Sequence, residues 1–330
     1  FLNPKHILSQ RLFYFSSYRL SGMDRYPRGQ DPILPAVLEF PEEPQEQFLA
    51  RVITHLDVTT PTFRLAPAYT LYLCARYRAS THYRPELTPT ERAHKLTVLL
   101  QHAAMLIRHT VQDRSTESTS QAFWLANASE LLHFLKSDRH VSAFSIQAQD
   151  TLADAVQLAF KNLVACLTDE LNSAMAHLMS VAGDDHPREV INILSGAMNL
   201  LRKCRVNAAL TIQLFSQLFH WISAKALANV ISNSNLCTRT FGNKLFNRLR
   251  NLQAWAESQG LELAAECHLA KIVQCAHLMQ APKYTPEELA NLSSACFKLN
   301  SMQLGALLRQ YKGNRLLHSS NYMYKLFLSS

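Results

Sequence analysis

Glycine and proline are scarce in this chain, and a long part of it contains neither. The 330 residues include eight glycines and thirteen prolines, and ten of the prolines lie at or before Pro89. Both residue types are absent from Thr90 to Ala182. Because glycine and proline interrupt helices and supply the turns of β-hairpins, their absence predicts long helices and argues against a β-sheet fold. With 48% apolar residues, the chain can build a real hydrophobic core.

The chain also lacks the motifs of nucleotide-binding and hydrolytic enzymes. No Walker-type loop, dinucleotide fingerprint or GxSxG turn occurs in it. Its seven cysteines are odd in number and scattered through apolar helical patterns, which is typical of reduced thiols in a cytosolic protein rather than of a disulfide framework. We therefore expect no catalytic residues and no cofactor.

Two polar clusters contain metal-ligating residue types, and neither has the residue spacing of a known metal site. Asp184, Asp185 and His186 place two carboxylates beside an imidazole, but they lie in a break rich in glycine and proline, where polar residues are common. Cys267, His268, Cys275 and His277 do not match the short spacings that bring four ligands around Zn²⁺. We expect no metal site.

Acidic residues are missing from one long stretch, whereas basic residues are frequent in it. Between Val190 and Ala256 there is no Asp or Glu, while eight Lys and Arg residues in that stretch equal the net charge of +8 of the whole chain. The segment from Asp31 to Asp57 has the opposite bias. A basic face without acidic neighbours on its own helix favours either tertiary ion pairs or an acidic partner.

No run of apolar residues is long enough to cross a membrane. The most apolar segment has no charge between Arg205 and Lys225, but Gln213, Gln217 and His220 interrupt it. We expect a helix with apolar residues around most of its axis, packed inside other helices of a soluble protein.

Hydrophobic periodicity predicts an all-α fold of about ten helices. Thr88 with Glu91, and Thr285 with Glu288, form capping boxes with a proline at the first helical position, and Gly260 is expected to end a helix. A short helix is also expected at about 45–56. The main helices are expected at about 67–80, 89–112, 118–137, 146–181, 188–203, 206–231, 237–258, 261–280, 286–295 and 300–311.

The clearest internal break lies at Gly183 to Pro187. It suggests two stacked lobes, one at about 62–182 and one at about 188–311. Residues 1–33 are expected to be a linker or flexible segment, and residues 312–330 a disordered tail. The chain begins at Phe1 without an initiator methionine, as expected of an internal part of a longer protein.

Several long blocks resemble the dilute (DIL) domain, in the version found in the junctional scaffold afadin/canoe and, more distantly, in the cargo-binding tail of class V myosins. Three of them lie in the second half of the chain, at Gly196–Ile222, Leu252–Gln274 and Cys296–Tyr311. Three more lie upstream, at Thr62–Arg78, Arg84–Lys95 and Ala122–Lys136. The resemblance covers roughly Pro35 to Tyr311, so the DIL domain is expected at about 34–311.

The resemblance implies an elongated helical bundle like the myosin V globular tail, with a non-catalytic, protein-binding function. It implies a scaffold that links cell adhesion at adherens junctions to the actin cytoskeleton and recruits helical or coiled-coil adaptors in the cytoplasm. In that family, actin and small GTPases are bound by regions outside a chain like this one. The alternatives are a myosin V-like cargo-adaptor-binding domain or a basic module that contacts an anionic membrane surface. A metabolic enzyme is the least favoured class.

The basic stretch is the candidate binding site. On the expected helix 237–258, Arg239, Lys244, Arg248 and Arg250 lie opposite the apolar side or at its edge, so all four are expected to be exposed. An ordinary solvated surface is the competing interpretation, and no aromatic interleaving or known module supports nucleic acid. The hypothesis is that an amphipathic helix of a partner docks in an inter-helix groove and that its acidic flanks contact the face containing Lys244 and Arg248. The candidate partner-binding residues are seven cations: Arg239, Lys244, Arg248, Arg250, Arg202, Lys203 and Arg205.

Overall fold

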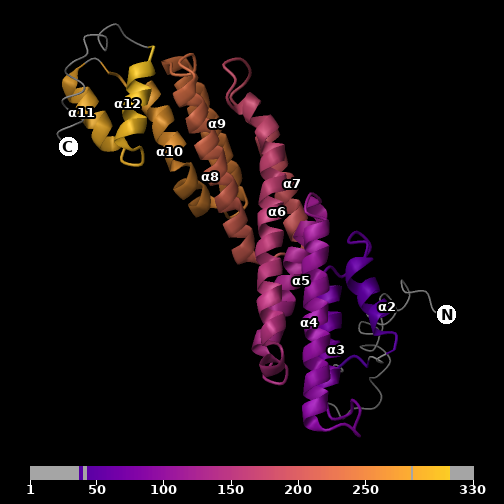
Figure 1. Cartoon of the computed structure of the whole chain (residues 1–330). Coiled ribbons are helices and arrows are strands. Elements are labelled where there is room, and N and C mark those ends of the chain that lie inside the picture. Colours follow the sequence, from indigo (N-terminus) through magenta and orange to yellow (C-terminus); the bar gives the residue numbers. More distant parts are fainter. Residues whose placement is uncertain (1–36, 40–42, 284, 313–330) are drawn as a thin grey trace, which may run out of the picture. The chain divides into compact units, whose positions relative to one another are not determined.

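The computed structural model describes residues 37–39, 43–283 and 285–312 (Figure 1). In these ranges the chain forms eleven α-helices, a π-helical turn and a 3-10 turn, and no β-strand. The expected all-α class is confirmed. The expected flexible segment 1–33 and nearly all of the expected tail, residues 313–330, lie outside the described residues.

The ten main helices predicted from the sequence are all present, with ends within a few residues of the expected ones. The short helix expected at 45–56 is an α-helical turn that continues as a π-helix, Ala50–Thr54. The α-helices are α2 (Gln45–Leu49), α3 (Ala66–Ala79), α4 (Pro89–Asp113), α5 (Ser118–Ser137), α6 (Ile146–Leu178), α7 (Arg188–Cys204), α8 (Ala208–Ser232), α9 (Arg239–Ser258), α10 (Glu262–Gln280), α11 (Pro286–Ala295) and α12 (Ser301–Gln310).

Local hydrogen bonds explain where several helices begin and end. Thr88 and Glu91 form the expected reciprocal capping box at the start of α4. Thr285 and Glu288 make the same pair of bonds at the start of α11. Gly260 has a φ of 75° and follows α9, where its N–H and that of the next residue donate to carbonyls of the last turn. These bonds form a Schellman motif, for which glycine is preferred because a positive φ places no Cβ in strain.

The chain divides into two compact units. Unit 1 contains residues 1–163 and 200–206, and unit 2 contains residues 164–199 and 207–330. The division falls inside α6 and α7 rather than at the Gly183–Pro187 break, because each of these continuous helices contributes residues to both units. The lobe limits expected from the sequence stay a prediction.

In unit 1, α5 has eleven buried residues. Phe123 and Trp124 are fully buried, and α5 packs against α3 and α4. Two buried amide side chains on α5 bind the backbone of the connections around it. Asn127 donates to the carbonyl of Arg64 at 2.9 Å, and Gln121 donates to that of Arg114 at 2.7 Å. Buried polar groups are tolerated when they are hydrogen-bonded, and these two hold the loops to the helix.

In unit 2, α10 packs against both α8 and α9. Gly242 on α9 lies so close to α10 that a Cβ atom there would be 2.6 Å from Cβ of Met279. The expectation that α8 is apolar and buried around most of its axis was wrong. The helix buries one face, which includes Phe215 and Phe219, whereas Ile212 is 47% exposed. The opposite face carries Gln213, Gln217 and His220, and these polar side chains lie at the surface.

Candidate functional site

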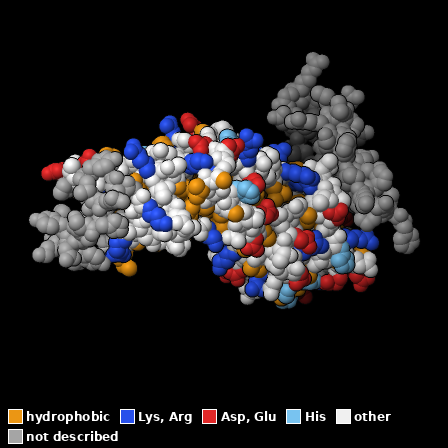
Figure 2. Space-filling view, turned by 90° about the horizontal axis from the view of Figure 1, so that it is seen from above, with side chains coloured by type: hydrophobic (Ala, Val, Ile, Leu, Met, Phe, Trp, Pro, Cys, Tyr) orange, Lys and Arg blue, Asp and Glu red, His pale blue; other side chains and the backbone are white. Residues whose placement is uncertain are grey.

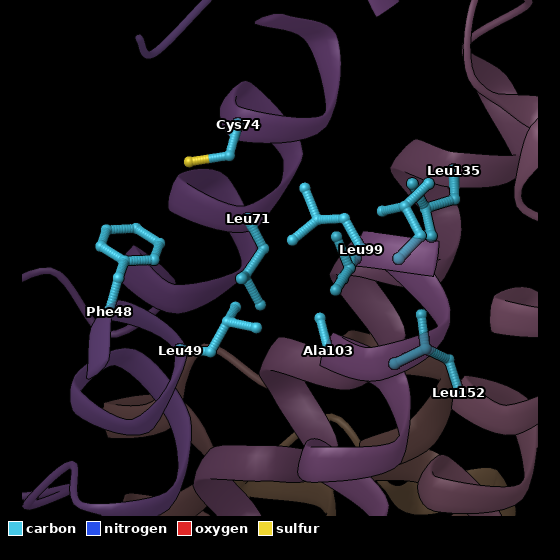
Figure 3. A pocket seen from close by; sticks show the side chains of 10 residues that line it. Phe48, Leu49, Leu71, Cys74, Leu99, Ala103, Leu135 and Leu152 are labelled. Atoms are coloured by element: carbon cyan, nitrogen blue, oxygen red, sulfur yellow. The ribbon is translucent and has the colours of Figure 1, made fainter. Parts of the chain in front are cut away.

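The cavity in the core of unit 1 is too small to be a ligand site. Its volume is about 10 Å³, and it is lined by apolar side chains from α2 to α6 (Figure 3). Figure 3 shows Leu71, Leu99 and Leu135 around this space, with Cys74 above Leu71 in the view. A volume of this size holds about one water molecule. Burial raises the pKa of the Cys74 thiol to about 12, so this thiol is not an activated nucleophile.

Of the two candidate metal clusters, the one at Asp184, Asp185 and His186 has a structural role. In the described residues, no group of three or more His, Cys, Asp or Glu side chains is placed to hold a metal ion. Asp184 accepts from the His186 backbone N–H at 3.3 Å, and Asp185 accepts from the Asn247 side chain at 2.7 Å. These acids therefore stabilise the α6–α7 connection, as expected of polar residues in such a break. None of the described helices is long and apolar enough to span a lipid bilayer.

Arg248 is buried, which contradicts the expectation that it is exposed. Its side chain is 2% exposed, and its guanidinium donates to four backbone carbonyls of the α6–α7 connection. The acceptors are Leu178 at 2.9 Å, Ser180 at 2.7 Å, Ala182 at 3.3 Å and Asp184 at 2.8 and 3.1 Å. A guanidinium is suited to this role because it presents five donors in a planar fork. Arg248 is therefore a structural residue and is not free to contact a partner.

The error has a clear physical source. Arg248 lies on the same stripe of α9 as Phe241, Leu245 and Leu252, which are all buried. A charged residue on an apolar stripe is normally assigned to its edge, because burying a charge is costly unless hydrogen bonds replace water. The carbonyls that replace water here are 64 to 70 residues away in the sequence. Lys244, also expected to be exposed, is half-buried and donates to the carbonyl of Gly183 at 3.0 Å.

The other five candidate cations are exposed, and they belong to different units. Arg202 and Lys203 in the last turn of α7, and Arg205 just after it, are assigned to unit 1. Arg239 and Arg250 lie on α9 in unit 2. None of the five forms an ion pair with a residue that the structure describes. On the face shown in Figure 2, Lys and Arg side chains are spread over the molecule, and Asp and Glu are more frequent over the N-terminal helices.

An open groove lies in unit 2 beside Arg239. Its volume is about 480 Å³, and it is bounded by α9, α10 and α11. Its polar lining comes from Arg239, Asn243 and His277, with two glutamines on α10. The apolar part comes from Ala281 and the end of α11, including Leu292 and Cys296. No acidic side chain is among the residues that line it.

The lining side chains differ in how far the fold already uses them. Gln280 donates to the carbonyl of Gly242 at 3.2 Å, and the Gln274 side chain accepts from the Lys298 backbone at 2.8 Å. The side chains of Arg239 and Asn243, in contrast, have no hydrogen bond to any described residue. The groove therefore presents a guanidinium and an amide whose donors are available to a ligand.

The basic surface continues along α9 beyond the groove. The ring centroids of Phe246 and His277 are 4.5 Å apart. The Phe246 ring also contacts Arg250, whose guanidinium carbon lies 5.8 Å from the ring centroid. Arg239, Asn243, Phe246 and Arg250 recur at steps of four, three and four residues, so they lie along one side of the helix. We call Arg239, Asn243, Phe246, Arg250 and His277 the α9 strip.

Sequence reasoning found the two arginines of the α9 strip and missed its other members. Asn243 and Phe246 share the helical spacing of the arginines, and this spacing was a usable signal. His277 comes from α10, and nothing in the sequence places it beside Phe246. A surface of this kind, with donors and an aromatic ring but no paired acid and base, is suited to binding rather than to proton transfer.

The fold is that of the cargo-binding tail of class V myosins. The apo structure of Myo2-GTD superimposes with a TM-score of 0.63 at 19% identity, covering 82% of this chain and 77% of that one. A structure described as a myosin V cargo binding domain superimposes with a TM-score of 0.61 at 18% identity, covering 82% and 76%. The expected myosin V globular-tail-like architecture is confirmed.

The family model described as DIL domain matches residues 213–315 of this chain. Unconventional myosin-Vb of Rattus norvegicus is 22% identical over 320 residues, which covers 83% of this chain and 17% of the relative. The Ras-associating and dilute domain-containing protein of Mus musculus is 24% identical over 375 residues, covering 90% and 33%. The expected resemblance to DIL domains is confirmed. The chain spans a third or less of the length of these relatives.

Proposed function

We propose that this chain is a non-catalytic domain that recruits adaptor proteins. The observation that carries the proposal is the open groove beside Arg239, with donors that no described residue uses, on a fold shared with cargo-binding domains. Structures of Myo2-GTD in complex with Smy1, with Mmr1 and with Inp2 have the same fold.

The myosin V-like cargo-adaptor-binding function has better support than an afadin/canoe-like role at adherens junctions. The similar proteins and structures named above are myosin V tails and a Ras-associating and dilute domain-containing protein. The junctional scaffold, linked to actin in the cytoplasm, is the second candidate. It rests on the sequence blocks around Gly196–Ile222 and Leu252–Gln274. A motor domain and long heptads upstream in the full-length gene would favour the first candidate.

The proposed partners are helical or coiled-coil adaptors with acidic flanks. Arg239 and Arg250 would contact these flanks in unit 2, and Arg202, Lys203 and Arg205 would do so in unit 1. Exposed charges of this kind chiefly change the association rate and its salt dependence, whereas buried apolar anchors carry most of the affinity. Lys244 has a lesser part because its ammonium already binds a carbonyl. Arg248 has none, since its guanidinium is buried.

The test is partner capture followed by direct binding. The tagged chain is used to recover proteins from a cell lysate, and each recovered protein is then purified and titrated against the chain. We expect at least one purified protein to bind directly, with an association rate that falls as salt increases. Charge reversal at Arg239 and Arg250 in one variant, and at the three α7 cations in another, assigns the binding to a unit.

Two controls separate this function from its alternatives. Lys225→Glu reverses an exposed charge on α8 outside the α9 strip and should leave binding unchanged. Vesicles of neutral lipid with about 30% anionic lipid test the membrane-surface alternative at physiological salt. If no purified protein binds the chain while the vesicles do, or if the chain turns over a metabolite, the adaptor function is wrong.

A further inference from the structure

The α9 strip has the length and the charged groups to bind two acidic side chains of a helix lying alongside it. Arg239 and Arg250 are eleven residues apart on one continuous helix. At about 1.5 Å per residue, their backbone positions are separated by about 16 Å, which is three helical turns. Both side chains are exposed and project from the same side of α9.

We infer that the α9 strip binds an acidic amphipathic helix that carries two carboxylates about eleven residues apart. One carboxylate contacts Arg239 and Asn243 at the groove, and the other contacts Arg250. An apolar side chain between the first carboxylate and the middle of the helix enters the groove against Leu292 and Ala281. This inference rests on the proposed adaptor-binding function and specifies the partner's chemistry.

The charge of the groove selects a carboxylate-bearing partner. Among the described residues that line the groove none is acidic, and neither arginine forms an ion pair with a described residue. On α9 and α10 the acids closest in sequence are Glu257, past Arg250, and Glu266, eleven residues before His277. The first turn of α11 carries Glu287 and Glu288, and neither is among the residues that line the groove. An anionic partner therefore meets donors without displacing an internal ion pair. Guanidinium and carboxylate also match in shape, because each can make two parallel hydrogen bonds.

The middle of the strip selects a helix rather than a flexible acidic tail. Phe246 and His277 form an aromatic contact between the two arginines, and Phe246 is half-buried. A partner that crosses this contact needs an apolar side there and charges at both ends, which is the pattern of an amphipathic helix. A helix also keeps two carboxylates at a fixed separation, so less conformational entropy is lost when both bind.

The experiment uses three labelled helical peptides and the whole chain. All three share the same apolar side, and fluorescence anisotropy measures their binding. The first has Glu at positions i and i+11, the second has Glu at i and i+7, and the third has Gln at i and i+11. An exposed ion pair is worth up to about fivefold in affinity at low salt. We expect the first peptide to bind about fivefold more tightly than the second and about 25-fold more tightly than the third.

A charge swap provides the decisive control. In Arg239→Glu the binding of the first peptide should fall, and a fourth peptide with Lys at position i should recover it. Lys225→Glu makes the same change in net charge on α8 and should have no effect on either peptide. If Arg239→Glu only disturbed the structure, it would weaken the binding of both peptides. Restored binding by the Lys peptide therefore indicates direct contact with position 239.

The inference is overturned by equal binding of the Glu and Gln peptides, by no binding of the first peptide at about 1 mM, the weak end of measurable affinity, or by failure of the charge swap. The adaptor-binding function has a separate outcome. If a purified adaptor binds wild type and the Arg239→Glu, Arg250→Glu double variant equally, the function stands and the α9 strip is not its site.

Discussion

Replacing Arg248 by methionine should strongly destabilise unit 2. Methionine has a similar length and fills the same space, but it cannot donate to the carbonyls of Leu178, Ser180, Ala182 and Asp184. A hydrogen bond from a charged donor contributes about 1.5 to 3 kcal/mol. The carbonyls of Ala182 and Asp184 lie in an exposed segment, so water can replace the guanidinium there.

The loss is therefore set by the two deeper carbonyls. Leu178 is buried and Ser180 is half-buried, and both accept from the same guanidinium nitrogen, Nη1. Two bonds of this strength give an expected loss of about 3 to 6 kcal/mol in the free energy of unfolding. Arg248→Lys keeps the charge but has one donor group, so an intermediate loss of about 2 kcal/mol is expected.

Urea denaturation followed by circular dichroism measures the loss, and trypsin cleavage measures the loosening of the α6–α7 connection directly. Arg188 is exposed just after this connection and should be cleaved faster in Arg248→Met. Lys244→Met is the matched control, because it removes a single bond from a half-buried side chain and should cost less than about 1 kcal/mol. Equal urea midpoints and equal cleavage rates in the two variants would refute the assigned role of Arg248.

Four further substitutions have effects whose direction is set by the structure. Gly242→Ala should destabilise the fold by about 1 to 3 kcal/mol and so lower the melting temperature, because the added Cβ would lie 2.6 Å from Cβ of Met279. Gly196 is on α7, and a Cβ added there would have nothing within 4 Å, so Gly196→Ala should instead stabilise the fold by about 0.5 to 1 kcal/mol. Thr88→Ala should cost about 1 kcal/mol through loss of the α4 cap, measured by urea denaturation, and an unchanged midpoint would contradict it. Burial lowers the pKa of Lys283 from 10.5 to about 8, so the unfolded chain binds more protons between these values and stability should rise with pH there. Lys283→Met removes this pH-dependent contribution, so the stability of the variant relative to wild type should decrease from pH 8 to pH 10.5. A difference in stability that stays constant over this range would exclude the lowered pKa of Lys283.

The sequence was sufficient to predict the helices because helix signals are local. Thr88 and Glu91 are three residues apart, and Gly260 acts on the turn just before it, so each can be recognised without knowing the fold. Apolar periodicity located α6 and α9 for the same reason. The DIL resemblance also rests on contiguous blocks, which are readable in order along the chain.

The candidate site was only partly predictable. Arg239 and Arg250 were expected to be exposed, and they are, because both lie away from the apolar stripe of α9. Arg248 was misplaced because its acceptors come from a distant segment, and a helical pattern gives no information about carbonyls elsewhere in the chain. His277 was missed as a neighbour of Phe246 because that contact depends on how α10 packs against α9.

By itself, therefore, the sequence determined the all-α class, the helix limits and the excess of positive charge between Val190 and Ala256, since these depend on neighbouring residues and on composition. Only the tertiary structure decided which of these charges are available. The packing of α9 against the α6–α7 connection uses Arg248 internally, and the packing of α9, α10 and α11 leaves Arg239 beside an open groove. The physical reason is that the burial of a charge depends on partners brought together by folding, and these partners are far apart in the chain.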